Sequence, residues 1–569
     1  MSYAGSMKEI RFGQFGIVSD LASDAMPDGG LIRCENGQFL NGIVEKAEEI
    51  SDWVRSNPTY STPTFTTEKP IANHRYFPFP REERQIVVTD AGVVYKYTSP
   101  FLRTALTAET SSDPTTLSIS GMPVIATGGN EVQGNAKKVF IYTGNSQVQV
   151  MEADEDTRRS ITNPAADWSS TFPTYGLIFR SKHACIMGHT LYLSPSTDHE
   201  DFRAATSGVQ VIQCFPGEGE GIISAFIYKT KLFVFKAPYG VYVLNDTDTD
   251  PDNWFFQKSS GSFGIASPQS FFEATDDYYV MSNDGTVISM TAALRMGDIY
   301  NADLLSASKN SVFFRAKIRN QYLNRSFGAY LPKKKIGVFG FASYTSSGGY
   351  CDSLVYIDFN GDVPRISWHR YKNTEFASCH YFRDPYSDDK FLFTKHKYSS
   401  GSYTTGVMGT YYPSYSSNTP FRLQTPHSNL GVPANKLFDG FELIFESGAV
   451  YPLAVDVYVD SKYSERFLIQ PFYGDALGPA FFSISRFANP LFLLGTDSLV
   501  GRGTRPKWHS LHARGHTISF VIRDGNVIDS PYTGAPNADD DLGSALPVKI
   551  AGIRVYYRVA GQDQKSQSS

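Results

Sequence analysis

The sequence predicts an all-β protein, with a β-propeller of about six blades and a C-terminal β-sandwich that serves as a platform. Three observations carry this prediction. The 569 residues include 41 Phe, 34 Tyr and 5 Trp, so aromatic residues make up 14% of the chain and charged residues only 19%. That balance is typical of pleated sheets rather than of long charged helices. Alternating apolar and polar residues are broken repeatedly by tight turns, and this texture changes near Asn418.

Hairpin-like segments recur along the chain, as in QIVVTDAGVVYKYT at Gln85–Thr98. Turn centres fall near residues 91, 145, 188, 239, 284, 334 and 387, about 43 to 54 residues apart. Intervals of this length are typical of propeller blades, which indicates about six of them. The other segments with this pattern are Lys137–Met151, His183–Ser194, Phe226–Leu244, Asp277–Thr291, Lys317–Phe341, Ser353–His369 and Phe376–His396.

The propeller, with inserted loops, is expected over residues 71–430 and the sandwich over residues 431–560. From Lys436 onward, alternating strands follow one another about ten residues apart, as they do in antiparallel sandwiches. Residues 1–70 are expected to form a strand or arm that packs on the platform. The strand-like phrase at Gly16–Lys46 is too short to be stable alone, and chain ends commonly lie close together. Residues 561–569 are expected to be a disordered tail.

Helix is expected in two short places. Val44–Arg55 has apolar residues at the spacing of a helical stripe, and Asp298–Ser306 is compatible with one short helix between blades. Ser56–Lys69 is rich in Thr, Ser and Pro, which is typical of a linker or an extended arm.

Charge and cysteine content exclude several classes of protein. Lys and Arg total 52 and Asp and Glu total 57, a net charge of −5, which excludes a broadly basic nucleic-acid coat. No apolar run approaches the roughly 18 residues that a membrane span needs, and the N-terminus lacks the pattern of a secretory signal. The odd number of cysteines and the lack of a CxxC pair favour reduced, buried thiols in a protein folded in cytoplasm. These cysteines are Cys34, Cys185, Cys214, Cys351 and Cys379.

Two clusters have the composition of metal sites. His509, His512 and His516 are the densest histidine group, but a turn and a strand follow and the glutamate of an HExxH motif is missing. The acidic run from Asp246 to Asp252 has Pro251 and Gln257 where a calcium loop needs Gly and Glu. Both clusters, and the acidic residues 539–541, are therefore interpreted as structural.

Enzyme motifs are equally weak, so no catalytic, cofactor-binding or metal-binding residue is assigned and the protein is not expected to be an enzyme. Ser282–Val287 has a composition related to the repeated turn of sialidase-like propellers, but the wrong spacing, and an ordinary hairpin turn explains it. The GEGEG run at Gly217–Gly221 places glutamates where a phosphate would bind, so it is interpreted as a flexible turn. Lys333–Lys335 is the only concentrated basic patch. It is interpreted as a solvated hairpin tip, with contact to DNA phosphates or an acidic partner as the alternative.

The N-terminal stretch carries a resemblance to a known family. Its phrases are Gly16–Leu21, Met26-Pro27-Asp28-Gly29-Gly30, and Glu35-Asn36 followed by Phe39, Gly42 and Lys46. This opening resembles that of podovirus tail nozzle proteins, also called tail tubular protein B or phage DNA-stabilisation proteins. It departs from the family at Ser23-Asp24, where a proline is missing, and at Cys34. Similar phrases occur at Leu191–Phe202, Phe226–Leu244, Ala266–Met290 and Leu499–Asp524.

The resemblance implies a structural virion protein of a bacteriophage tail, assembled in the cytoplasm of the bacterial host. Six copies would form a nozzle below the head–tail adaptor ring, and the nozzle would enclose the channel that retains viral DNA and conducts it during ejection. The implied partners are the other copies, the adaptor ring, tail fibres or tailspikes, tail-tip proteins and the double-stranded DNA, with no membrane insertion and no cofactor. A mildly acidic wall agrees with this role, because evenly spaced cations would hold DNA by counterion release.

Two other classes of function remain open. A receptor-binding or glycan-binding propeller would carry a cluster of exposed aromatic residues at one mouth. A glycan-hydrolysing propeller would carry convergent carboxylates.

Overall fold

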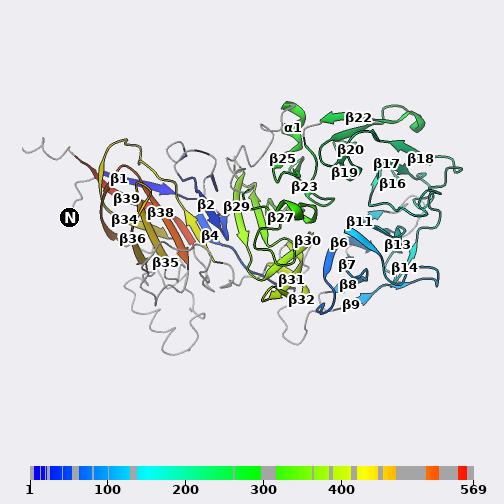
Figure 1. The fold of residues 1–569 in the computed structure, drawn as a ribbon, viewed down its shortest axis with the longest axis horizontal. Coiled ribbons are helices and arrows are strands. Elements are labelled where there is room, and N and C mark those ends of the chain that lie inside the picture. The colour runs from blue at the N-terminus through cyan, green and yellow to red at the C-terminus, as the bar shows by residue number, and fades with distance from the viewer. Residues whose placement is uncertain are drawn as a thin grey trace, which may run out of the picture.

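The computed structural model has two parts, a ring of small sheets and a β-sandwich beside it (Figure 1). The first described strand, near the N-terminus, lies in the sandwich, at the end of the molecule away from the ring. No helix in the described part of the chain has the length and apolar character needed to cross a membrane. The structure describes residues 6–12, 15–18, 21, 26–27, 29–40, 43–53, 63–79, 82–99, 102–128, 137–260, 263–296, 316–361, 364–382, 389–411, 420–445, 453–469, 508–524 and 549–560.

The ring is a β-propeller, and its blades are antiparallel sheets taken in chain order. Blade 1 consists of β6 (Pro70–Phe79), β7 (Glu82–Thr89), β8 (Val94–Ser99) and β9 (Leu102–Ala105). Blade 2 consists of β11 (Ile119–Gly128), β12 (Lys138–Gly144), β13 (Gln149–Glu152) and β14 (Thr157–Ser160), and β10 (Thr107–Ala108) pairs with β14 in parallel. Blade 3 consists of β15 (Tyr175–Phe179), β16 (Lys182–Met187), β17 (Thr190–Leu193) and β18 (Gln210–Gln213). Blades 4 and 5 consist of β19 (Ile222–Tyr228), β20 (Lys231–Lys236), β21 (Val241–Asn245) and β22 (Phe255–Ser260); and β23 (Phe271–Ala274), β24 (Asp277–Met281) and β25 (Val287–Ser289).

The remaining blades connect the ring to the N-terminal segment. Blade 6 consists of β26 (Phe327–Leu331), β27 (Ile336–Phe341), β28 (Ser353–Asp358) and β29 (Arg365–Arg370). Blade 7 consists of β30 (Thr374–Phe382), β31 (Lys390–Ser399), β32 (Ser402–Tyr411) and, as its fourth strand, β5 (Ile50–Asp52). The described helices are α1 (Met290–Met296) and the 3-10 turns η2 (Pro251–Asn253) and η3 (Asn320–Arg325).

The ring closes because the first strand of blade 7, β30, packs against the first strand of blade 1, β6. The N-terminal strand β5 then completes blade 7 from outside, pairing Asp52 with Gly409. The propeller prediction is confirmed, and the described residues form seven sheets rather than about six. Six of the seven turn centres predicted from the sequence lie in six different blades, and the seventh, near residue 387, falls outside the described residues, between β30 and β31. The repeats share a pattern of alternation rather than residues, which is why the sequence alone gave the lower number.

Side chains fill part of the propeller axis. Ile71 and Ala377 are buried on the first strands of blades 1 and 7, and Met122 on the first strand of blade 2 packs against their cluster. The Nε2 of Gln269, just before blade 5, donates a hydrogen bond to the Pro123 carbonyl of blade 2 at 2.7 Å. The segment just before blade 5 is therefore tied directly to the first strand of blade 2.

The platform is a sandwich of two sheets that share one apolar core. Its first sheet contains β1 (Ser6–Arg11), β3 (Gly37–Leu40), β4 (Ile43–Lys46), β34 (Lys436–Phe445), β37 (Trp508–Gly515) and β39 (Lys549–Val559). The second contains β2 (Arg33–Glu35), β33 (Arg422–Gln424), β35 (Leu453–Val459), β36 (Lys462–Ile469) and β38 (Ile518–Asp524). Because β2 also pairs with β29, blade 6 and this second sheet form one nine-stranded sheet.

The helix predicted over Val44–Arg55 is wrong. The segment contains β4 and β5, two strands in different sheets, and residues 54 and 55 lie outside the described residues. Val44 and Ile50, which suggested a helical stripe, are both buried, one by the platform core and the other by the core of blade 7. Strand pairing with distant segments overrides the local helical spacing here. The second predicted helix, at residues 298–306, also lies outside the described residues, just after α1.

Candidate functional site

The N-terminal residues that carry the family resemblance form the joint between propeller and platform. Asn36 follows β2 with a positive φ of 51°, a conformation that asparagine tolerates better than most residues. Its Oδ1 accepts a hydrogen bond from the Arg370 backbone N–H of blade 6 at 2.8 Å. Its Nδ2 donates to the Pro420 carbonyl, which precedes β33, at 2.6 Å. One buried side chain thus holds blade 6 and the platform together.

Two glycines let the N-terminal segment lie directly on its neighbours. A Cβ on Gly37 would stand 2.8 Å from the Cys34 sulfur, closer than side-chain packing allows. Gly16 has a φ of 70°, and a Cβ there would stand 2.8 Å from the backbone nitrogen of Ile366 in β29. The Ile17 backbone N–H donates to the Ile366 carbonyl at 3.1 Å, which continues the contact along the edge of blade 6.

A buried ion pair joins the last residue of the N-terminal phrase to the C-terminal part of the chain. The Lys46 Nζ lies 2.5 Å from the Asp524 Oδ2, and neither side chain reaches solvent. The other oxygen of Asp524 accepts a hydrogen bond from the Phe421 backbone N–H at 2.7 Å. Burial lowers the pKa of Lys46, and the Asp524 carboxylate opposes that shift. The pair fixes β4 to β38 across 478 residues of sequence.

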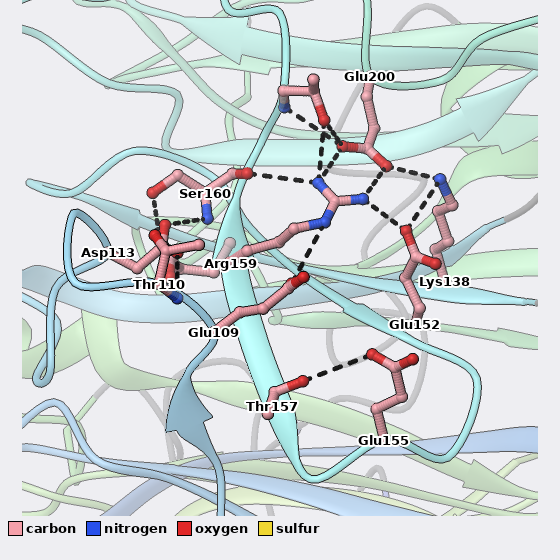
Figure 2. A network of polar contacts seen from close by, with 12 residues as sticks. Glu109, Thr110, Asp113, Lys138, Glu152, Glu155, Thr157, Arg159, Ser160 and Glu200 are labelled. Carbon is pink, nitrogen blue, oxygen red and sulfur yellow. Dashed lines mark hydrogen bonds and ion pairs between the residues drawn. The ribbon is translucent and has the colours of Figure 1, made fainter.

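A second charged cluster ties blade 2 to blade 3 around Glu200 (Figure 2). Glu200 lies in the loop between β17 and β18 and is buried. Its Oε1 and Oε2 accept hydrogen bonds from Arg159 at 2.9 and 2.5 Å, a bidentate pair with the last strand of blade 2. Lys138 Nζ lies 2.6 Å from Oε1. Thr162 also donates to Oε2, through its hydroxyl, at 2.9 Å.

These contacts determine the ionisation of Glu200. Burial alone would raise the pKa of Glu200, but the hydrogen bonds and charges of Arg159 and Lys138 lower it to about 2. Glu152 also pairs with Arg159, at 2.5 Å. Arg159 and Lys138 therefore compensate the buried Glu200 and its neighbour Glu152, and these contacts make the cluster an inter-blade clamp.

Replacing Glu200 by Gln should lower the free energy of unfolding by about 2 to 3 kcal/mol, because Arg159 and Lys138 lose their buried carboxylate. Urea unfolding followed by circular dichroism measures the change. Glu155→Gln is the matched control, since this exposed side chain of the same cluster has only a 3.4 Å contact from Thr157. The control should stay within about 0.5 kcal/mol of wild type. Equal losses in the two variants would contradict the clamp.

The histidine group does not converge on a metal site. His509 and His512 lie on β37, not on a helix, three positions apart and so on opposite faces of the strand. His509 stacks on Phe441 with ring centroids 5.3 Å apart, and the His512 Nε2 is 3.1 Å from the Ser510 hydroxyl. His516 lies beyond the end of the strand. Within the described ranges, no three histidine, cysteine or acidic side chains are grouped as metal ligands would be.

The acidic run after β21 is held by its own hydrogen bonds. The Asp248 carboxylate accepts from the Asp250 backbone N–H at 2.9 Å, and Asp250 caps η2 by accepting from Asp252 N–H at 3.1 Å. Asp246 is buried instead and pairs with Arg180 of blade 3 at 2.6 Å. The turn at Ser282–Val287 is a hairpin turn, as predicted, closed by a bond from Ser282 N–H to the Thr286 carbonyl. Residues 539–541 lie outside the described residues.

No pattern in the sequence indicates the Cys–His pair that lies in blade 3. Cys185 Sγ lies 3.4 Å from the His183 Nε2, which also contacts the Tyr142 hydroxyl. Burial raises the pKa of the Cys185 thiol and lowers the pKa of His183 to about 3, so both groups are neutral. Because burial keeps the Cys185 thiol protonated, it does not form a thiolate nucleophile, and the pair is part of the core. All five cysteines are free thiols and buried, as predicted.

Comparison with known proteins assigns no family to the chain. No family model and no curated protein matches it. Among solved structures, the protein YCF48 from Cyanidioschyzon merolae is 8% identical with a TM-score of 0.38, over 62% of this chain and 98% of that chain. BBS1N, solved in complex with ARL6DN, is 8% identical with a TM-score of 0.36, over 64% and 98%. The computationally designed protein Ika8 is 11% identical with a TM-score of 0.35, over 72% and 100%.

Two further segments singled out in the sequence lie on the propeller surface. Lys333–Lys335 forms the exposed tip of the hairpin between β26 and β27, as predicted. The GEGEG run at Gly217–Gly221 connects blades 3 and 4 and wraps around the buried Lys236, which donates to the Phe215 carbonyl at 2.7 Å. The run predicted to be a flexible turn is therefore fixed by an ammonium group.

Proposed function

We propose that this chain is a structural protein of a bacteriophage tail, a subunit of the nozzle below the head–tail adaptor. The observation that carries the proposal is the use of the family-like N-terminal residues. Asn36, Gly37 and Lys46 all belong to the joint between propeller and platform, where each makes a close or buried contact. Residues with this role suit a protein whose two parts must keep a fixed geometry under load.

The topology adds mechanical support for this role. The nine-stranded sheet runs without interruption from blade 6 into the platform. The first 52 residues contribute strands to the platform, to the nine-stranded sheet and to blade 7, so that pulling on either part loads hydrogen bonds in both. A chain built in this way resists separation of its two parts.

In the proposed assembly, six copies close into a ring by head-to-tail contacts. Their common channel retains packaged DNA and conducts it during ejection, with the adaptor ring above and fibres or tailspikes attached. A net charge of −5 favours weak contact with phosphates, and the exposed Lys333–Lys335 tip offers one place for a brake on the DNA.

Quantitative mass spectrometry of virions that carry this chain tests the proposal. About six copies per particle are expected, together with weak binding of the purified protein to duplex DNA at physiological salt. Labelling the chain in electron micrographs should mark the tail below the head. A single copy per particle, absence from particles, or tight sequence-specific DNA binding would each reject the nozzle.

A further inference from the structure

Two neighbouring loops on one face of the propeller present exposed aromatic rings. The first, from Cys214 to Gly221, connects β18 of blade 3 to β19 of blade 4, and its Phe215 is 38% exposed. The second is the turn between β20 and β21, where Tyr239 is 54% exposed. The two loops are tied by a hydrogen bond from Glu220 N–H to the Ala237 carbonyl at 2.9 Å. The two loops that carry the rings are therefore adjacent.

The first loop is held rigidly from below. The buried Lys236 donates to the backbone carbonyls of Cys214, at 3.3 Å, and of Phe215 and Glu218. The Phe215 ring leans on Tyr242, with centroids 5.1 Å apart and planes 30° apart. The Glu218 carboxylate accepts from the Tyr242 hydroxyl at 2.9 Å. One side of the Phe215 ring is thus supported by the protein, while the ring itself remains partly open to solvent.

The backbone at Phe215 indicates that its side chain is useful. Its φ is 41°, in the left-handed region that bulky residues avoid and that glycine adopts freely. Strained positions of this kind persist where the side chain serves a purpose, often at ligand sites. The same loop has glycines at 217, 219 and 221, so glycine is accepted nearby. The sequence nevertheless keeps a phenylalanine at the strained position.

We propose that this surface binds uncharged saccharide chains, with Phe215 and Tyr239 as the stacking platform. A rigid aromatic ring with an open face offers apolar surface to the C–H face of a sugar at little entropic cost. Carboxylates beside the rings accept hydrogen bonds from sugar hydroxyls, and Glu220 lies in the same loop as Phe215. The charge of Glu218 is balanced by Lys258 at 2.6 Å, so the exposed Glu220 is the carboxylate that disfavours anionic sugars.

A protein partner fits this surface less well. Stable protein interfaces bury about 800 Å² on each side around an apolar core depleted of glutamate. Here the two rings are flanked by Pro216, Pro238 and the two glutamates instead. The inference goes beyond the proposed tail function and does not depend on it, because its readout is sugar binding by the purified chain.

A glycan array tests the inference with the full chain, using chitohexaose, cellohexaose and maltohexaose as uncharged probes and sialylated oligosaccharides as charged ones. Wild type should bind at least one uncharged probe. Phe215→Gly and Tyr239→Ala should each weaken that binding at least tenfold in titration calorimetry. Tyr344→Ala, which removes an exposed tyrosine of blade 6, is the matched control and should bind as wild type does.

Phe215→Gly also separates binding from folding. Glycine relieves the strain at φ 41° but gives up the ring contact with Tyr242, so these two effects oppose each other and the variant should melt within a few degrees of wild type while losing the sugar. Several results would overturn the inference: no binding of the uncharged probes, binding only of sialylated probes, or binding that survives Phe215→Gly. Loss of a copurifying protein, without any sugar binding, upon Phe215→Gly would assign the surface to a protein partner and overturn it as well.

Discussion

Acidification from pH 7 to pH 4 should strongly destabilise the protein, because several fully buried histidines are held neutral. Burial lowers the pKa of His183 and of His369 to about 3 and that of His396 to about 4. In the unfolded chain these groups take up protons near pH 6.5. The unfolded state therefore binds more protons below that pH, and the free energy of unfolding falls as the pH falls. Between pH 7 and pH 4, each of these histidines lowers the free energy of unfolding by about 2 to 3 kcal/mol.

Urea unfolding midpoints between pH 7.5 and pH 4 measure this effect. Replacing His396 by Gln should flatten the pH dependence, since its Nε2 bonds only to the Pro70 carbonyl at 2.8 Å, which an amide N–H can also reach. His512→Gln, on the exposed face of β37, is the control and should leave the slope unchanged. Glu200, with its pKa lowered to about 2, adds to the loss only below about pH 4.5. Midpoints that stay constant from pH 7 to pH 4 would contradict this account.

Removing either member of the Lys46–Asp524 pair should cost about 3 to 5 kcal/mol of unfolding free energy, since the other charge stays buried and loses its 2.5 Å ion pair. Asp524→Asn is the cleaner change, because the amide oxygen still accepts the Phe421 backbone N–H. Chemical denaturation followed by circular dichroism measures the loss.

The double variant Lys46→Met with Asp524→Asn isolates the charge effect. With no ammonium left in the core, it should be more stable than Asp524→Asn alone. Arg11→Gln is the control for a solvent-exposed pair of the same platform, since Arg11 lies 2.7 Å from Glu9 at the surface, and it should change stability by less than about 0.5 kcal/mol. If the double variant loses as much unfolding free energy as the two single variants lose when their losses are added, the two residues do not act as a coupled pair.

The fold class could be predicted from the sequence where the signal is local. Alternation and turn spacing identified the propeller, and six of the predicted turns lie in six different blades. The failure at Val44–Arg55 has a physical cause. Val44 and Ile50 happen to be spaced as on a helix, but Val44 pairs with Ile550 of β39 and Ile50 pairs with Tyr411 of β32, both more than 350 residues away. Such partners are invisible in a local window.

The same limit applies to the sites. The resemblance drew attention to Asn36 and Lys46, yet their partners, Arg370, Pro420 and Asp524, are known only from the fold. Glu200 lies inside a phrase noted for its likeness to the tail family, with no charge pattern to reveal its role in the clamp. The residue types around Phe215 do not indicate that its backbone is strained.

The placement of β5 has a consequence for biosynthesis. Residues 50–52 leave the ribosome early, but they pair with residues 409–411, so blade 7 waits for a strand made about 360 residues later. The platform is completed later still, because β1 pairs with β39 near the end of the chain. Such distant pairings slow folding and keep strand edges open during translation. A chain that ends before residue 409 can complete neither part, and one that ends before β39 cannot complete the platform.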